Sequence, residues 1–356
     1  LEVSYLYPAA DMTRGLSGAI APDEVERMLK KDASLRTVLI TSPTYDGVCS
    51  DVRRIAEIVH QYDGILIVDE AHGAHFGMHP YFPEHALTCG ADLVINSVHK
   101  TLPSLTQTAL LHVQGMRVDR ERLKRFLGMY QTSSPSYVLM AGIDACVRML
   151  LEHGPELFDT FAKRLEGLRK QLFCMQALEL VRGTEPELGA YDYDRSKILV
   201  ATRRSGIAGP ELSGMLRSRY QLEMEMDSEH YVTAITTVAD TKEGLQRLAE
   251  ALAAIDSELE CRTGKPARPF AAWKNEAVLR IGEAAEAGKK SMLLARSEGS
   301  ISAEFVYLYP PGIPLLVPGE RISGELLEKL LQYRADGFAL EGMADYRGEE
   351  IRVVKA

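Results

Sequence analysis

Apolar residues in the first third of the chain follow two alternating patterns. Short apolar runs rich in β-branched residues occur at Thr37–Thr41, Ile65–Asp69, Leu93–Ser97 and Ala109–Val113. Between the first two runs, residues 51–62 carry apolar side chains at helical spacing. Continuous apolar strands separated by helices are typical of a mainly parallel sheet covered on both faces, so the pattern predicts an α/β fold.

The pattern changes twice further along the chain. Residues 119–177 predict helices, and residues 178–260 predict short strands with two helices, an α+β arrangement. The polar stretch 261–269 predicts a linker. We therefore expect a large domain at 1–150, a small α+β domain at 151–262 and a C-terminal α+β domain at 263–356.

Composition narrows the classes of protein that fit. The 356 residues are 46% hydrophobic and 26% charged, which is ordinary for a globular protein. The net charge of -9 gives no positive footprint for nucleic acid, and no apolar run reaches the ~18 residues of a membrane span. The five cysteines are scattered without CxxC spacing, which favours reduced thiols and a cytoplasmic protein.

Two strand ends carry residues suited to a carbonyl cofactor. Asp69 ends one predicted strand, and Ser97 ends the next and is soon followed by His99 and Lys100. Carboxyl ends of parallel strands meet at the edge of the sheet where ligands bind, so these side chains are expected to face one crevice. A lysine there can form a Schiff base, and pyridoxal 5′-phosphate (PLP) also needs a carboxylate that keeps its ring nitrogen protonated. Each residue alone also fits a structural role, as a loop lysine or a helix N-cap, but the pair favours a PLP site.

Five segments, in this order, resemble the successive signatures of the ornithine/lysine/arginine decarboxylases: Thr41–Gly47, Val68–Gly77, Ser97–Leu102, Thr132–Ser136 and Ser302–Glu320. The resemblance runs over essentially the whole chain and indicates the short bacterial form. It implies the aspartate-aminotransferase-like fold of PLP enzymes, fold type I. It also implies decarboxylation of arginine, lysine or ornithine to the corresponding polyamine-pathway amine and CO2.

The resemblance also implies roles for the residues at the strand ends. Lys100 would be the Schiff-base lysine, and Asp69 would partner the pyridine nitrogen. Ser97 would lie at the phosphate and His99 near the reacting carbon. His99 or the freed Lys100 could then return a proton to Cα.

Other cofactor contacts are implied on the neighbouring segments. Ala71 would pack against one face of the cofactor ring. His72 stands in the region where the larger bacterial members carry Trp, and we expect it to contact the cofactor too. Thr44 or Tyr45 would lie close to the phenolic oxygen.

Two features of the family have no counterpart in the chain: its Gly/Ser/Thr-rich phosphate loop and the histidine that stacks on the other ring face. The first residue is Leu1 rather than an initiator Met, and Leu1–Tyr7 predicts an extended segment entered within a domain. We therefore expect the native protein to carry roughly a hundred or more residues before Leu1, including that loop and that histidine.

A basic amino acid carries a cation that acidic or carbonyl groups must recognise. The acidic run of Glu223, Glu225, Asp227 and Glu229 is a candidate, although such runs are also typical of a solvated surface. The resemblance further implies at least a homodimer, with Thr132–Ser136 contributing to the phosphate site of the neighbouring subunit.

Two alternatives share the fold. An aminotransferase usually needs an arginine for the substrate carboxylate, and no motif here nominates one. A truncated, non-catalytic homologue would explain why the N-terminal features of the family have no counterpart here. However, a protein that performs no chemistry has no reason to keep both Asp69 and Lys100.

Two further patterns resemble a helicase motif and a zinc site, but each fits its model poorly. Asp69–His72 spells the DEAH box of helicases, but the nearest phosphate loop, Gly282–Ser291, has one residue too many and lies downstream. His72, His75 and His79 lack a standard zinc-ligand spacing, so no metal is expected.

Overall fold

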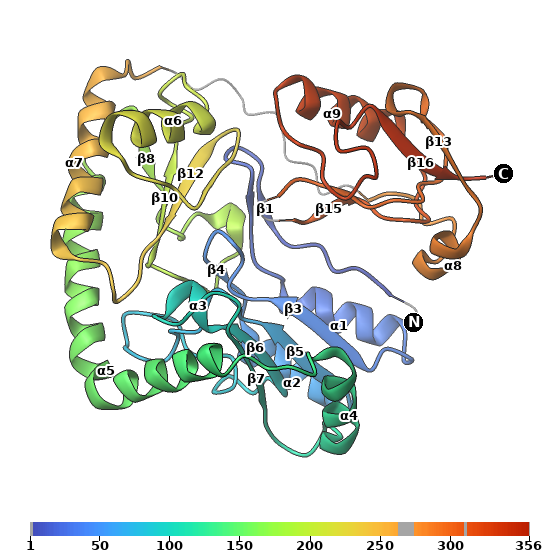
Figure 1. Ribbon diagram of the computed structural model, residues 1–356, viewed down its shortest axis with the longest axis horizontal. Helices are drawn as coiled ribbons and strands as arrows, with labels where there is room; N and C mark the ends of the chain where they lie inside the picture. Colours follow the sequence, from blue (N-terminus) through green and yellow to red (C-terminus); the bar gives the residue numbers. More distant parts are fainter. Residues whose placement is uncertain (1–2, 263–273, 310–311, 356) are drawn as a thin grey trace. The chain divides into compact units, whose positions relative to one another are not determined.

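A computed structural model describes residues 3–262, 274–309 and 312–355 (Figure 1). The chain divides into two compact units: Leu6–Phe270, and Leu1–Tyr5 together with Ala271–Ala356. Most of the linker expected at 261–269 lies outside the described residues. The division expected near residue 150, inside the larger unit, stays a prediction.

The larger unit contains a four-stranded sheet whose strands match the four apolar runs of the sequence. The order is β3 (Thr37–Thr41), β5 (Ile65–Asp69), β6 (Leu93–Ser97) and β7 (Ala109–Val113). The first three strands run parallel, as expected, but β7 is antiparallel to β6. The reason is the short connection at 98–108, because a parallel return needs a crossover of about a dozen or more residues.

The two faces of this sheet differ. Helices α1 (Pro22–Lys31) and α2 (Val52–Gln61) share one hydrophobic core with alternate residues of β3, β5 and β6. On the opposite face of β3, Leu39 is 60% exposed. Coverage of both faces was expected; among the described residues, the face of β3 that carries Leu39 is exposed.

A second sheet follows the long helix. It is antiparallel, and it packs with the second half of α5 (Tyr137–Leu172) and with α6 and α7 into another hydrophobic core. The elements, in sheet order and then chain order, are β11 (Met226–Asp227), β12 (Tyr231–Ile235), β10 (Lys197–Ala201), β8 (Glu179–Leu180), α6 (Gly209–Tyr220) and α7 (Lys242–Glu258).

Short elements connect the two sheets within this unit. The most important is the antiparallel pair β4 (Val48–Cys49) and β9 (Asp192–Tyr193), which joins a segment just after β3 to one just before β10. The remaining elements are β1 (Ala10–Asp11), β2 (Leu16–Ser17), α3 (Val98–Thr101), α4 (Arg120–Tyr130) and the 3-10 turn η1 (Pro186–Leu188).

The smaller unit is an α+β structure with its own hydrophobic core. Strands β13 (Lys289–Leu293) and β16 (Glu350–Val354) pair antiparallel, and α9 (Gly324–Ala335) contributes buried leucines to the core. Its other elements are α8 (Ile281–Glu286), η2 (Leu294–Arg296), β14 (Val306–Tyr307) and β15 (Pro314–Leu316).

Candidate active site

The carboxyl ends of β5 and β6 lie side by side. Asp69, the last residue of β5, is in parallel register with Ile95, two residues before Ser97 at the end of β6. The half-buried carboxylate of Asp69 accepts a hydrogen bond from the backbone N–H of Ala71 at 3.0 Å. This bond turns the chain directly after the strand. The two strand ends therefore meet at one edge, as the sequence predicted.

The buried side chain of Glu70 stabilises the same turn from the core side. Its carboxyl is buried, accepts the N–H of Ala86 at 2.8 Å and contacts the Asn96 amide at 3.1 Å and His85 Nε2 at 3.0 Å. Burial raises the pKa of Glu70 to about 8, although the hydrogen bonds from Asn96 and Ala86 act to lower it. Because Glu70 points into the core, its neighbours Asp69 and Ala71 are held at the sheet edge.

Lys100 lies on α3, a single helical turn that begins directly after β6. Its Nζ is 3.0 Å from Nε2 of His72, so the two motifs that end the neighbouring strands touch through these side chains. The adjacent His99 points elsewhere, with Nδ1 2.9 Å from the backbone oxygen of Thr108. A carbonyl oxygen only accepts, so Nδ1 of His99 carries a hydrogen.

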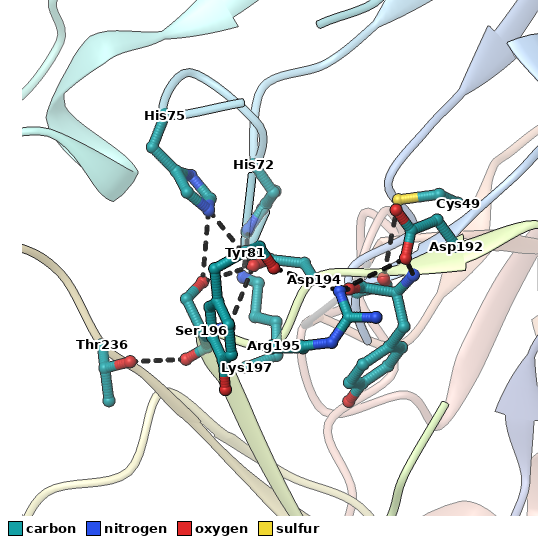
Figure 2. Close-up of polar contacts among 12 residues, drawn as sticks. Cys49, His72, His75, Tyr81, Asp192, Asp194, Arg195, Ser196, Lys197 and Thr236 are labelled. Atoms are coloured by element: carbon teal, nitrogen blue, oxygen red, sulfur yellow. Dashed lines mark hydrogen bonds and ion pairs between the residues drawn. The ribbon is translucent and has the colours of Figure 1, made fainter. Parts of the chain in front are cut away.

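A second lysine reaches the same imidazole from the other sheet. Lys197 begins β10, is fully buried and places Nζ 2.8 Å from Nδ1 of His72 (Figure 2). Each ring nitrogen of His72 therefore faces a lysine amine. Burial, and then the charges of Lys197 and Lys100, lower the pKa of His72 to about 2, so this imidazole is neutral.

The charge of Lys197 has negative partners at longer range. Burial lowers its pKa to about 8, while Asp194, Glu225 and Asp46 oppose that shift. Asp194 is itself buried and lies three residues before Lys197, in the segment that follows β9.

Asp194 holds a compact polar cluster, drawn in Figure 2. Its Oδ1 lies 3.1 Å from Nε2 of His75 and accepts the Ser196 hydroxyl at 2.6 Å. Burial raises the pKa of this carboxyl, but the charge and hydrogen bond of His75, with Lys197 and Ser196, outweigh it and hold the pKa below its usual value. Asp194 is therefore ionised beside Lys197.

Tyr45 completes the surroundings of His72. The two ring centroids are 4.6 Å apart, and the Tyr45 hydroxyl donates to Glu225 Oε1 at 2.6 Å. Thr44 lies in the preceding turn, where its hydroxyl accepts the N–H of Val48 at 3.1 Å. Of these two neighbours, Tyr45 is the one that contacts His72.

The structure thus brings His72 and Lys100 into direct contact and places Asp69, Ala71 and Ser97 at the same sheet edge. Sequence reasoning missed Lys197 and its partner Asp194. One signal was available: a lysine opening an otherwise apolar strand run, three residues after an aspartate.

His75 and His79 also differ from zinc ligands in their surroundings. His75 bonds Asp194, and His79 Nδ1 accepts the N–H of Tyr81 at 3.1 Å. Over residues 3–262, 274–309 and 312–355, no group of three or more His, Cys, Asp or Glu side chains is arranged to hold a metal.

Across the same ranges, none of the helices combines the length and the apolar character that crossing a membrane requires.

Comparison with solved structures identifies the fold. The constitutive lysine decarboxylase of Escherichia coli superimposes with a TM-score of 0.79 at 18% identity, over 99% of this chain and 64% of that one. Alanine–glyoxylate aminotransferase from Nostoc sp. superimposes with a TM-score of 0.51 at 16% identity, over 67% of this chain and 66% of that one. The fold is that of the fold-type-I PLP enzymes, and the chain spans less than two thirds of the E. coli enzyme.

Comparison of sequences narrows the class to one family. The Orn/Lys/Arg decarboxylase major-domain model matches residues 3–190, and the model of that family's C-terminal domain matches residues 278–337. Arginine decarboxylase of Bacillus subtilis is 30% identical over 361 residues, covering 99% of this chain and 72% of that protein. The chain belongs to the Orn/Lys/Arg decarboxylase family, and thus to the amino-acid decarboxylases, which are lyases.

Proposed function

We propose that this protein decarboxylates a basic amino acid with PLP, and that arginine is its first candidate substrate. One observation carries the proposal. Lys100, on the turn after β6, touches His72, on the turn after β5 that Asp69 opens. Arginine is placed first because the B. subtilis relative at 30% identity is named an arginine decarboxylase.

The residues at the sheet edge fit PLP chemically. Lys100 is half-buried rather than buried, which would let an aldehyde reach its amine. One oxygen of Asp69 accepts the Ala71 N–H, and over the described part of the chain the other oxygen has no hydrogen bond. That second oxygen can accept a bond from a protonated ring nitrogen. When bound, PLP supplies a sink for the electron pair left on Cα as CO2 departs.

Three residues would hold the remaining parts of the cofactor. The Ser97 hydroxyl has no hydrogen bond within the described ranges, which leaves it available to a phosphate oxygen. Ala71, half-buried beside Asp69, would offer its methyl group to one ring face. Thr44 lies beside Tyr45 in the turn near His72, which supports a place for one of this pair near the phenolic oxygen.

His99 is suited to hold a proton for Cα. Its Nδ1–H donates to Thr108, so the ring has a fixed orientation and Nε2 can take up and return a proton. The amine of Lys100 would be the alternative donor of this proton. Both side chains come from one helical turn, α3.

Glu225 is our candidate for recognising the cation of the substrate side chain. It is exposed, accepts the Tyr45 hydroxyl and through that ring adjoins His72. Glu223 instead pairs with Arg217, so it serves the surface of the small sheet. Of these two residues, Glu225 is thus the better candidate.

We also infer that the protein works as at least a homodimer. Large apolar side chains are exposed along α4 and the first half of α5, an arrangement typical of a protein interface. Light scattering should give at least twice the mass of the chain, and a strictly monomeric, active protein would contradict this. The exposed side chains are Met129 65%, Tyr130 88%, Tyr137 80%, Val138 70% and Leu151 80%.

The cellular setting that fits best is the cytoplasm, with the amine product entering polyamine synthesis. All five cysteines are free, which is compatible with a reducing compartment.

The deciding experiment is a product panel. The protein is supplied with PLP and separately with arginine, lysine and ornithine, and both amine and CO2 are measured. We expect stoichiometric amine and CO2 from arginine, and neither from the Lys100→Ala variant. Transfer of the amino group to an added oxo-acid, without CO2, would replace the proposal by an aminotransferase.

A further inference from the structure

A cavity of about 390 Å³ lies within the larger unit and shares no residue with the sheet-edge site. Three buried leucines form its floor, at the end of α5 and along the segment that contains β8. Phe173, which is 44% exposed, also lines it. The cavity is therefore of a size that suits a small molecule and has an apolar base. The leucines are Leu172, Leu178 and Leu180.

Three arginines line the same cavity, and they differ in how their charges are balanced. Arg14 pairs with Asp11 at 2.5 Å and with Glu179 at 2.7 Å. Arg182 and Arg204 are both exposed, and within the described residues neither guanidinium lies within ion-pair distance of a carboxylate. Two of the three positive charges are thus available to an anion.

The contacts of Arg182 and Arg204 leave them able to bind a ligand. The Arg182 guanidinium lies over the Phe173 ring, 4.9 Å from its centroid, and Arg204 places Nη2 3.3 Å from Sγ of Cys261. A stacked guanidinium keeps its edge free, and that edge can donate two parallel hydrogen bonds to a carboxylate or phosphate. Phe173 and Arg182 therefore combine an aromatic surface with an anion-binding group.

Two carboxylates also line the cavity, and the protein engages both. Glu179 pairs with Arg14, and Glu185 accepts the backbone N–H of Arg182 at 2.9 Å. The second oxygen of Glu185 is buried. Three guanidinium groups against two carboxylates leave the lining with one excess positive charge. This balance favours an anionic ligand over a basic amino acid or an amine.

We infer that this cavity binds a small organic anion. Its oxyanion group, a carboxylate or a phosphate, pairs with Arg182 and Arg204, and its apolar or aromatic body covers the leucine floor and Phe173. The inference goes beyond decarboxylation, because no residue of the proposed cofactor site takes part.

The primary test is the binding of phenyl phosphate, and separately of benzoate, to the whole chain after loading with PLP and removal of the excess. Met175 also lines the cavity, so its carbon-13-labelled methyl group reports on the site by NMR. Met175→Leu identifies the signal. We expect at least one probe to shift it with a Kd of about 1 mM or below, which is ordinary for so small a ligand. A signal that neither probe moves would overturn the inference.

Variants of the two arginines test the cause. Arg182→Gln and Arg204→Gln each remove a charged donor at an exposed position and should weaken binding of the probe about 10- to 100-fold. Arg203→Gln removes the neighbouring exposed arginine, which does not line the cavity, and is the matched control. Circular dichroism checks that each variant is folded. Wild-type affinity in both cavity variants would refute the role of the arginines.

The apolar part of the ligand is tested separately with inorganic phosphate and benzyl alcohol. Phe173→Leu should weaken binding of the aromatic probe about 2- to 10-fold, as expected for loss of one aromatic pair. In the wild-type protein, inorganic phosphate and neutral benzyl alcohol should each bind more weakly than the probe that carries both groups. If either binds as tightly, the ligand is not an organic anion and the inference fails. Because every readout is binding, a protein that forms no CO2 would sink the proposed function alone.

Discussion

Two regions of the larger unit deliver a lysine to the same imidazole, and they do so in different environments. At the carboxyl edge of the mainly parallel sheet, Lys100 sits half-buried on a one-turn helix. At the start of β10 in the antiparallel sheet, Lys197 is fully buried. Because Lys197 is fully buried and Lys100 is not, we assign the cofactor to Lys100.

The backbone explains this difference. Lys100 follows a strand end, where the chain turns and the side chain borders a site open to ligands. Lys197 lies inside a ladder, paired with Ile235, and its carbonyl oxygen accepts a bond from buried Arg169 at 3.2 Å. A side chain so constrained can orient a neighbour but cannot follow a substrate.

Replacing Lys100 by Ala should have the largest effect. Lys197, the other lysine that contacts His72, is fully buried, so turnover should be abolished and covalent PLP lost. Amine production and absorbance of the bound cofactor measure this, with Lys163→Ala as a control that removes an exposed lysine. Decarboxylation at a near wild-type rate would show that Lys100 is not the cofactor lysine.

Asp194→Asn should cost the most stability in the region around β10. The change leaves His75 and Lys197 buried without their nearby carboxylate, a situation that typically costs about 3–5 kcal/mol. Urea unfolding followed by circular dichroism measures the loss. Ser196→Ala, which removes one hydrogen bond to the same oxygen, should cost only about 1 kcal/mol. Equal losses for the two variants would contradict a buried ionic cluster.

Asp69→Asn should separate cofactor attachment from catalysis. The variant keeps Lys100, so PLP should still become trappable by borohydride. Turnover should fall about 10²- to 10³-fold, because an amide stabilises the protonated ring nitrogen poorly. Asp159→Asn, on an exposed helix position, is the control. Full activity in Asp69→Asn protein would remove Asp69 from the site.

Glu225→Gln should act mainly on substrate binding. Loss of the charge opposite a guanidinium or ammonium should raise KM about 10- to 100-fold with a smaller change in kcat. Glu223→Gln is the matched control, because that residue pairs with Arg217 on the surface. If both variants have wild-type KM, the cation is recognised elsewhere.

The smallest effect is expected from the titration of Glu70. Its pKa is raised from 4.5 to about 8 by burial, so the folded protein binds this proton more tightly than the unfolded chain. The stabilising contribution is complete below about pH 4.5 and is lost as the pH rises toward about 8. Between pH 6 and 7 the free energy of unfolding should fall by at most about 1.4 kcal/mol. The fall should be shallower in Glu70→Gln, and identical slopes would contradict a raised pKa.

The fold and the site were predictable where the information is local. The apolar runs located β3, β5, β6 and β7 correctly, because period and length identify buried strands. The antiparallel direction of β7 was missed, since it depends on how short the connection between β6 and β7 is. Asp69 and Lys100 were predicted as site residues from the motifs at two strand ends.

The contact of Lys197 with His72 was not predictable in this way. The two residues are 125 positions apart, and their meeting depends on the β4–β9 pair and on the packing of two sheets. A single apolar run with a lysine at its start does not reveal which imidazole it will face.

The most direct test of the central claim is to locate the amine that binds PLP. The full-length protein is incubated with PLP, reduced with borohydride, digested and mapped by mass spectrometry. We predict the pyridoxyl group on the peptide that contains Lys100, in stoichiometric amount, and none on the peptide that contains Lys197. Stoichiometric labelling of Lys197 instead, or no specific label at either lysine, would contradict the account.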